Sequence, residues 1–321
     1  MRLRYNAGSL RRVSAAADFG RVAVLYGGSS AEREISLLSG AAVLAALKRR
    51  GVDAHGFDPA QRELAELRTD GFARTWIALH GPGGEDGTVQ GALEFLGVPY
   101  SGSGVTGSAI GMDKLRTKRL AGVSAVPTPD FVVLRQSADL DLALSRLGLP
   151  LIVKPASQGS SVGMTRVEQA SELPAAWRAA TQFEPLAFAE SWITGAEYTV
   201  AILQGEALPS IRIETPRTFY DYEAKYFRDD TRYFCPAGLG AQAEQQLREL
   251  ALRAFEACGA EGWGRADFMM DPGAHLLLLE INTVPGMTDH SLVPMAARGA
   301  GIDFDELVWR VLETSLVRTP C

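Results

Sequence analysis

Residues 264–282 show the strongest structural signal in this chain of 321 residues, and their sequence is GRADFMMDPGAHLLLLEIN. Two runs typical of β-strands, residues 265–270 and 276–281, flank the turn-forming sequence Asp-Pro-Gly-Ala at 271–274. Short apolar runs on either side of such a turn are the signature of a hairpin. We therefore predict an antiparallel β-hairpin in the last third of the chain.

Four polar side chains give this hairpin its chemical interest. Because successive side chains of a strand point to opposite faces, Arg265 and Asp267 share one face of the first strand, and Glu280 and Asn282 share one face of the second. If the register sets Asp267 opposite Glu280 and Arg265 opposite Asn282, two carboxylates face each other and repel unless a cation lies between them. Hard oxygen ligands of this kind suit Mg²⁺, which completes its shell with water and phosphate oxygens. This register would create a platform for metal and phosphate.

A plainer interpretation treats this face as an ordinary solvated surface. Antiparallel hairpins are commonly polar on the side that faces water. The four consecutive leucines at 276–279 favour burial on both faces instead. The leucines therefore weaken the solvated-surface interpretation.

A second candidate phosphate site lies in the middle of the chain. Residues 151–154 predict a buried strand that ends at Lys154, and the loop 157–163 is rich in Gly and Ser. Small residues let backbone N–H groups approach a phosphate, and a lysine supplies a positive charge. Such loops are often only flexible connections, and neither the Walker sequence nor GxGxxG after the first strand is present. Any nucleotide site here has a different architecture.

The N-terminal third predicts two βα units. A strand at 22–26 is followed by the turn 27–30 and by apolar residues at helical spacing over 35–45. A second strand at 76–79 precedes another helical pattern at 89–96. Strands that alternate with helices indicate an α/β unit with a mostly parallel sheet.

Glu32 and His80 both follow predicted parallel strands, where ligands of such sheets bind. Ser29 precedes Glu32 by three residues, so Glu32 also fits the N3 position of a capping box. A lone histidine is more often structural, and we predict for His80 only that it belongs to the pocket. Either residue is suited to meet a ligand amine.

Segments without such patterns set the expected boundaries. Residues 1–20 are rich in Arg, contain Ser and are poor in acids, a composition that also fits a transit peptide, although a flexible tail is the favoured interpretation. The Gly/Ser-rich stretch 101–111 is the first expected domain boundary. Apolar residues at 307–312 predict a terminal helix. Aromatic and charged residues are mixed at 219–226, which fits either an amphipathic surface or a lid that brings Lys225 to a phosphate.

Composition excludes several classes of protein. Hydrophobic residues make up 46% of the chain and charged residues 22%, which is enough apolar content for a folded core. The net charge of −6 and the scattered cations disfavour a nucleic-acid surface, and no apolar run reaches the roughly 18 residues of a membrane span. Three distant cysteines indicate reduced thiols in a cytoplasmic protein, not a disulfide framework or a zinc site.

Six motifs in order along the chain resemble the D-alanine:D-alanine ligases of the ATP-grasp superfamily. The motifs are GGSSAEREIS (27–36), HGPGGEDGTVQG (80–91), VKPASQGSSVGM (153–164), FYDYEAKY (219–226), GRADFMMD (264–271) and LLEINTVPGMTDHSLVPMAA (278–297). The resemblance implies a three-domain α/β ATP-grasp fold with a Rossmann-like N-terminal parallel sheet. The expected parts are a flexible tail at 1–20, a substrate domain at 21–102, a central ATP-grasp domain at 103–189 and a C-terminal ATP-grasp domain at 190–319.

The family's activity supplies an expectation for this chain. ATP would phosphorylate one D-alanine carboxylate, and the amine of a second D-alanine would attack the D-alanyl phosphate, releasing ADP and phosphate with D-alanyl-D-alanine. The dipeptide serves peptidoglycan synthesis, and hence cell wall biogenesis and cell shape. Two Mg²⁺ ions, or Mn²⁺ in their place, would be held by Asp267, Glu280 and Asn282. A cytoplasmic homodimer is the family expectation.

The resemblance also implies roles for residues around the first D-alanine. Glu32 would bind its ammonium group, with His80 nearby, and would form a hydrogen-bond triad with Ser160 and Tyr226 that closes the lid. Family members that make an ester with D-lactate lack the tyrosine at this place, so Tyr226 favours an amine acceptor.

Arg265 and the Gly286 N–H would stabilise the oxyanion of the tetrahedral intermediate. Ser291 and Leu292 would hold the carboxylate of the second D-alanine. Lys114 and Lys154 would contact the ATP phosphates, and Lys225 the γ-phosphate. The segment implied to contact adenosine contains Glu190, Trp192, Ile193 and Glu197.

Departures from the family's pattern are few. Ser157 and Gln158 replace an expected Arg-Glu or similar pair, and Val284 and Asp289 flank PGMT where small or hydroxyl residues are common. Three rival functions remain open: another ATP-dependent carboxylate-amine ligase, a nucleotide-binding regulatory module without catalysis, and a dehydrogenase. The missing GxGxxG counts against the dehydrogenase.

Overall fold

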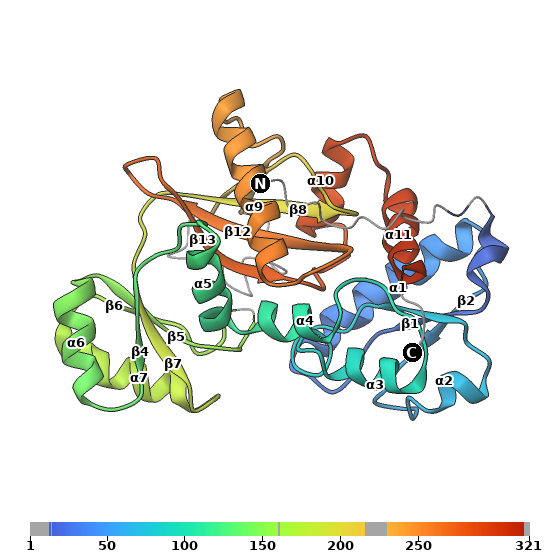
Figure 1. Cartoon of the computed structure of the whole chain (residues 1–321), viewed down its shortest axis with the longest axis horizontal. Helices are drawn as coiled ribbons and strands as arrows, with labels where there is room; N and C mark the ends of the chain where they lie inside the picture. Colours follow the sequence, from blue (N-terminus) through green and yellow to red (C-terminus); the bar gives the residue numbers. More distant parts are fainter. Residues whose placement is uncertain (1–12, 14, 160, 216–229, 318–321) are drawn as a thin grey trace.

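The structure, a computed structural model, describes residues 13, 15–159, 161–215 and 230–317. These residues form three β-sheets with helices around them. Figure 1 shows the N-terminal sheet at one end of the molecule, a four-stranded sheet at the other end and the largest sheet between them. Among the helices described, none is both long and apolar enough to cross a membrane. The mixture of helices and sheets confirms the predicted α/β class.

The N-terminal sheet has three parallel strands in the order β2-β1-β3. Its elements are η1 (Ala16–Phe19), β1 (Val22–Leu25), α1 (Arg33–Arg49), β2 (Ala54–Phe57), α2 (Glu66–Thr69), β3 (Arg74–Ile77) and α3 (Thr88–Leu96). All four residues of β1 are buried, as in a central parallel strand covered on both faces. The predicted parallel pairing of the two βα units is confirmed.

Among the described residues, regular structure begins before the strand at Val22. Ala16–Phe19, which sequence analysis places in the tail, form a turn of 3₁₀-helix. The ring of Phe19 is completely buried and meets the indole of Trp309 edge-on, with the ring centroids 4.8 Å apart. A single aromatic anchor leaves no periodic pattern, so sequence periodicity does not reveal it.

The four-stranded sheet is antiparallel, with the order β4-β7-β5-β6. Its elements are β4 (Phe131–Leu134), α6 (Ala138–Leu147), β5 (Leu151–Pro155), β6 (Thr165–Val167), η2 (Ala170–Glu172), α7 (Leu173–Thr181) and β7 (Ala187–Ser191). Leu151 and Val153 of β5 face a core formed with α6 and α7. The alternate residues Ile152 and Lys154 line a cavity on the other face.

The largest sheet has the order β11-β10-β8-β12-β13, with β9 also pairing β8. Its strands are β8 (Ala196–Leu203), β9 (Glu206–Ala207), β10 (Ile211–Glu214), β11 (Arg232–Phe234), β12 (Trp263–Met270) and β13 (Leu276–Asn282). The helices that follow or join these strands are α9 (Ala241–Ala257), α10 (Leu292–Gly299), α11 (Phe304–Glu313) and η3 (Thr314–Leu316). The predicted hairpin is β12–β13, and the predicted terminal helix is α11.

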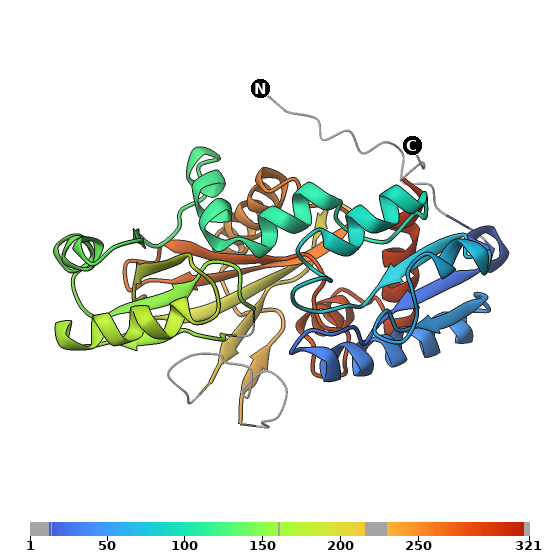
Figure 2. The same ribbon diagram turned by 90° about the horizontal axis from the view of Figure 1, so that it is seen from below.

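The stretch expected to separate the first two domains forms a helix. Residues 105–112 are α4 (Val105–Met112), and α5 (Lys114–Val123) follows at once. Both helices pack on β13, and Figure 2 shows them in blue-green, end to end along one side of the large sheet. The glycines here serve close packing, because a Cβ on Gly107 would lie 2.3 Å from the Gly259 carbonyl oxygen. The interpretation of 101–111 as a break in regular structure is therefore wrong over 105–111.

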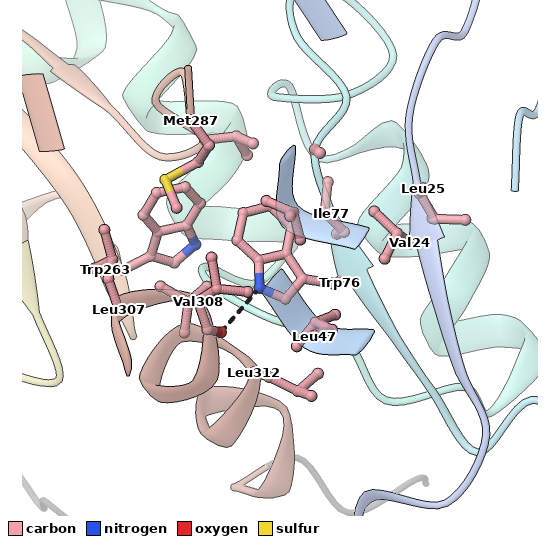
Figure 3. Close-up of a cluster of buried hydrophobic side chains, with 14 of the residues drawn as sticks. Val24, Leu25, Leu47, Trp76, Ile77, Trp263, Met287, Leu307, Val308 and Leu312 are labelled. Carbon is pink, nitrogen blue, oxygen red and sulfur yellow. Dashed lines mark hydrogen bonds between the residues drawn. The ribbon is translucent and has the colours of Figure 1, made fainter. Parts of the chain in front are cut away.

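One apolar core joins the N-terminal sheet to the C-terminal helices (Figure 3). The indoles of Trp76 on β3 and Trp263 on β12 are buried, with ring centroids 5.3 Å apart. The Trp76 Nε1–H donates to the Val308 carbonyl oxygen of α11 at 3.3 Å. Met287, in the loop after β13, is completely buried in the same cluster. The first sheet and this loop thus share one packed interior.

Substituting alanine for two helical glycines should have opposite effects on stability. Gly107→Ala should lower the free energy of unfolding by about 1–3 kcal/mol, because the new methyl group overlaps a carbonyl oxygen. Gly122→Ala in α5 has no heavy atom within 4 Å of the added Cβ, so it should raise that free energy by about 0.5–1 kcal/mol through helix propensity. Urea denaturation of both variants measures the difference. Equal effects would contradict the packing of α4 described above.

Candidate active site

The turn before α1 places the Glu32 side chain. Gly27 and Gly28 adopt φ of +79° and +71°, a conformation that side chains disfavour. Asp58 fixes the turn, because its carboxylate accepts from the Gly28 N–H at 3.0 Å and from both terminal nitrogens of Arg33, at 3.2 and 2.6 Å. The Arg33 guanidinium, opposed by burial but aided by backbone N–H groups, holds the pKa of Asp58 below its ordinary value.

The capping-box interpretation of Glu32 is wrong. Helix α1 begins three residues later than that motif requires, so Glu32 is itself the N-cap, and no side-chain cap bond forms. Its backbone N–H donates to Ser30 Oγ at 3.1 Å. Its carboxylate lies instead between two loops, since a Cβ on Gly81 or Gly159 would be 3.1 or 2.9 Å from Oε1. Glu32 therefore faces the pocket.

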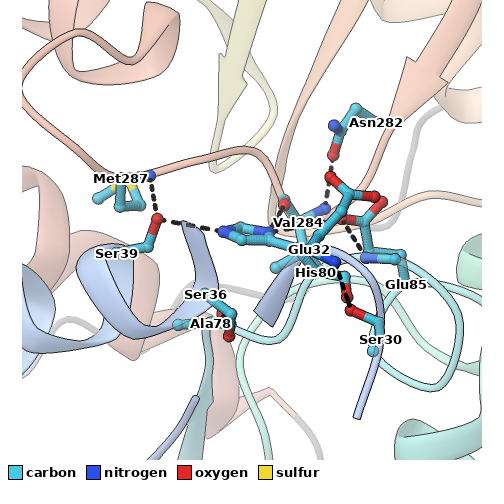
Figure 4. A network of polar contacts seen from close by, with 12 residues as sticks. Ser30, Glu32, Ser36, Ser39, Ala78, His80, Glu85, Asn282, Val284 and Met287 are labelled. Carbon is cyan, nitrogen blue, oxygen red and sulfur yellow. Dashed lines mark hydrogen bonds and ion pairs between the residues drawn. The ribbon is translucent and has the colours of Figure 1, made fainter. Parts of the chain in front are cut away.

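His80 lies near the start of the loop that joins β3 to α3, and it is 4% exposed. Its Nδ1 is 3.0 Å from the Val284 carbonyl oxygen and 3.4 Å from Glu85 Oε1, and its Nε2 is 3.1 Å from Ser39 Oγ (Figure 4). The structure thus brings His80 and Glu32 to one cavity, as predicted. The ring also connects the N-terminal unit to the loop after β13.

Two adjoining cavities occupy the junction of the three sheets. The larger has a volume of about 470 Å³, a size typical of small-molecule sites. The expected nucleotide and metal residues that line it are Lys114, Lys154, Glu190, Trp192, Ile193, Glu197, Asp267 and Glu280. The expected residues that line the smaller cavity are Glu32, His80, Lys114, Arg265, Glu280, Asn282 and Gly286. Lys114 and Glu280 line both cavities and lie where they meet.

The hairpin register brings the expected metal ligands together. Asp267 is opposite Glu280 and Arg265 is opposite Asn282, the register that creates a metal platform. Arg265 donates to both Asp267 oxygens, at 2.8 and 2.7 Å, and Thr199 on β8 donates to one of them at 2.6 Å. The second carboxylate, Glu280, pairs with Lys114 Nζ at 3.1 Å.

This donor set fits Mg²⁺ better than a transition metal. Within the described ranges, no cluster contains three or more His, Cys, Asp or Glu side chains suited to a metal. Two facing carboxylates and the Asn282 amide oxygen leave about half of an octahedral shell to water and phosphate oxygens, as suits Mg²⁺. Leu277 and Leu279 are only half-buried, so burial on both faces of β13 is incomplete, and Leu279 lines the larger cavity.

A cluster of buried charges forms one wall of the larger cavity. Glu190 on β7 is 1% exposed and pairs with Lys154 Nζ at 2.5 Å and with Lys118. Burial would raise the pKa of Glu190, but the two lysines hold it below its ordinary value. Burial lowers the pKa of Lys118, although Glu190 opposes the change. Lys118 also donates to Thr128 Oγ1 at 2.7 Å.

Sequence analysis missed Lys118. The available signal was its spacing, four residues after Lys114 on α5, which puts both ammonium groups on one helix face. Lys114 Nζ itself donates to the Gln158 carbonyl oxygen at 2.7 Å, which ties α5 to the Gly/Ser loop. Thr199, which donates to Asp267, was likewise not predicted.

Some expected residues do not meet the two cavities. Ser291 is the N-cap of α10 and its Oγ lies 2.8 Å from Thr288 Oγ1, while Leu292 packs in the apolar core. Neither residue lines the cavities described above. Ser160, Lys225 and Tyr226 lie outside the described residues, as does the expected lid at 219–226.

Comparisons with known proteins agree with one another. Residues 120–313 match the family model "D-ala D-ala ligase C-terminus", and residues 56–103 match "D-ala D-ala ligase N-terminus". A protein of Alkalilimnicola ehrlichii named D-alanine--D-alanine ligase is 63% identical over 297 residues, which cover 92% of this chain and 95% of that relative. The crystal structure of D-alanine--D-alanine ligase from Bacillus anthracis has a TM-score of 0.82 and 35% identity, over 92% of this chain and 97% of that one. A structure of the same ligase complexed with ATP has a TM-score of 0.81 and 33% identity, with equal coverage.

The buried charges should show strong energetic coupling. Lys118→Met and Glu190→Gln should each lower the free energy of unfolding by roughly 3 kcal/mol, because each leaves a buried charge short of a partner. The double variant should lose about 1–2 kcal/mol less than the sum of the two. Chemical denaturation measures all three, and Arg119→Met, on the exposed side of α5, should change stability by under about 0.5 kcal/mol. Strict additivity would contradict the ion pair.

Proposed function

Because this chain belongs to the D-alanine–D-alanine ligase family, we propose that its two adjoining cavities join two D-alanine molecules at the expense of ATP. The larger cavity takes ATP, and the smaller takes the amino acids. One D-alanine carboxylate receives the γ-phosphoryl group, and the amine of the second displaces phosphate to form the peptide bond. The observation on which this assignment depends is that Lys114 and Glu280 line both cavities, so the phosphoryl donor and acceptor meet there.

The smaller cavity supports the roles proposed for the amino-acid site. The Glu32 carboxylate reaches it from the start of α1 and is placed to accept the ammonium group of the first D-alanine. Arg265 and the Gly286 N–H reach it from β12 and the following loop, and we assign them to the oxyanion of the tetrahedral intermediate. Ser291 and Leu292 remain our proposal for the carboxylate of the second D-alanine.

The larger cavity supports the roles proposed for the nucleotide site. Lys114 and Lys154 approach it from α5 and β5, and their ammonium groups are suited to the phosphates. Trp192, Ile193 and Glu197 would contact adenosine. Glu190 would also contact adenosine. Its ion pairs with Lys118 and Lys154 hold the Lys154 side chain in place.

Asp267, Glu280 and Asn282 would hold the Mg²⁺ ions. An Mg²⁺ ion held by these residues would supply positive charge to the phosphate oxygens. Arg265 and Thr199 fix the position of the Asp267 carboxylate, and Lys114 fixes that of Glu280. The opposed carboxylates support this proposal, because their repulsion favours a cation between them.

We also propose a cytoplasmic homodimer whose product serves peptidoglycan synthesis. Cys235 and Cys258 are both free thiols, which is typical of a reducing compartment. Phe95 on α3 is 92% exposed, an apolar side chain that a second copy would cover. Sedimentation of the purified chain measures the assembly directly.

ADP and phosphate release tests the reaction. The protein is incubated with ATP and Mg²⁺ and with D-alanine, L-alanine or no amino acid, and products are identified by mass. We expect release only with D-alanine, together with D-alanyl-D-alanine. Release with another amine acceptor would retain the ligase chemistry and change the substrate. ATP binding without release in any arm would refute the proposed reaction.

Glu280→Gln should abolish turnover, with a loss of at least about 100-fold in kcat, because it removes a carboxylate from the proposed Mg²⁺ site. The matched control is Glu206→Gln, an exposed carboxylate on β9, which should keep wild-type activity. Both variants are assayed over a range of Mg²⁺ concentrations. Near-normal turnover of Glu280→Gln would show that the hairpin does not hold the metal.

A further inference from the structure

Two buried side chains of the N-terminal unit hold both ends of the loop 284–287, which follows β13 (Figure 4). Ser39 on α1 is completely buried, and its Oγ accepts the Met287 N–H at 3.1 Å. The same Oγ lies 3.1 Å from His80 Nε2, and His80 Nδ1 lies 3.0 Å from the Val284 carbonyl oxygen. A single Ser–His pair therefore contacts the first and the last residue of the loop.

The direction of each hydrogen bond follows from the acceptors. A carbonyl oxygen only accepts, so His80 Nδ1 bears the proton and donates to Val284. Glu85 Oε1, 3.4 Å from Nδ1, is also an acceptor. Nε2 of the neutral ring is then an acceptor, and the Ser39 hydroxyl donates to it while accepting from Met287. One neutral tautomer satisfies every contact of the pair.

Between the two held residues lie Pro285, which has no N–H, and Gly286, which lines the smaller cavity. The Val284 N–H is already directed to Asn282 Oδ1 at 3.0 Å. The position of the Gly286 backbone is therefore set by the anchors on either side. A shift at either anchor would move this backbone relative to the cavity.

Ser39 is also two turns along α1 from Glu32, its N-cap residue. The start of helix α1 holds Glu32, whose carboxylate we propose for the ammonium group. Two turns further along the same helix, Ser39 holds the loop that contains Gly286. The spacing between these two parts of the site is determined by one rigid helix.

We propose that Ser39, acting through His80, is a positioning residue that aims the Gly286 N–H at the oxyanion of the reaction. This inference depends on the role proposed above for Gly286. A donor aimed at developing charge affects the chemical step far more than the binding of ATP. Loss of the Ser39 hydroxyl should therefore change kcat selectively.

Ser36 provides a matched control on the same helix. It is also completely buried, and its Oγ accepts the Gly27 N–H at 2.8 Å and donates to the Ala78 carbonyl oxygen at 2.7 Å. Both partners belong to the N-terminal unit, so Ser36→Ala removes as many hydrogen bonds without releasing the loop 284–287. Its effect on stability should resemble that of Ser39→Ala.

Steady-state kinetics and thermal unfolding of both variants test the proposal. We expect Ser39→Ala to lower kcat by about 10- to 100-fold with an unchanged KM for ATP, since a displaced donor costs less than a deleted one. Ser36→Ala should keep kcat within about threefold, with a similar fall in Tm, because its lost bonds are matched in number. Equal kcat for the two variants would overturn the proposal. Should Ser39→Ala not fold, Ser39→Cys is the substitute, because a thiol of similar size is a weak donor and acceptor.

A second measurement separates this proposal from the proposed function. The chain contains four histidines, so ¹⁵N NMR of histidine-labelled protein can resolve the ring of His80, assigned by its loss in His80→Gln. We expect Nδ1 to bear a proton in the wild type, and an unprotonated Nδ1 would refute the network. A wild type with a protonated Nδ1 but no dipeptide synthesis would refute the proposed reaction while leaving the network intact.

Discussion

The two carboxylates of Asp267 and Glu280 face each other across the β12–β13 ladder, and much of the surrounding structure compensates their repulsion. Like charges at opposed positions destabilise a sheet, so each needs a cation of its own. Arg265, from the same strand, serves Asp267, whereas Glu280 depends on Lys114 from another part of the chain. The packing of α5 on β13 is therefore an electrostatic requirement as well as an apolar contact.

The parts of this arrangement that follow from local patterns were predictable. The hairpin, the parallel N-terminal sheet and the strand ending near Lys154 each show the periodicity of their element. In β5 the alternation of side chains between the two faces of the strand places Leu151 and Val153 in the core. It directs Ile152 and Lys154 to the cavity. The register of the hairpin was one of the arrangements allowed by the sequence, and the structure has the one that pairs the carboxylates.

The features that sequence analysis missed depend on contacts between distant segments. Lys118 belongs to the charge cluster only because α5 approaches β7, and no local pattern encodes that approach. The glycines of α4 resemble a linker, although Gly107 in fact permits contact with the backbone at Gly259. Glu32 satisfies the spacing of a capping box, but α1 begins three residues later than that box requires. In each case tertiary packing overrides a valid local preference.

The largest sheet and its helices meet the N-terminal sheet through apolar packing, but they meet the four-stranded sheet partly through ion pairs. The N-terminal and largest sheets share one extensive apolar core, with Trp76 against Trp263, so Glu32, His80 and the loop 284–287 are held as one body. The four-stranded sheet has a separate core and meets α5 through a small apolar cluster around Leu115 and through the ion pairs of Glu190. A polar junction resists displacement less than a large apolar one. The parts of the smaller cavity formed by Glu32, His80 and the loop 284–287 are therefore held rigidly, whereas the wall formed by Lys154 depends on a balance of charges.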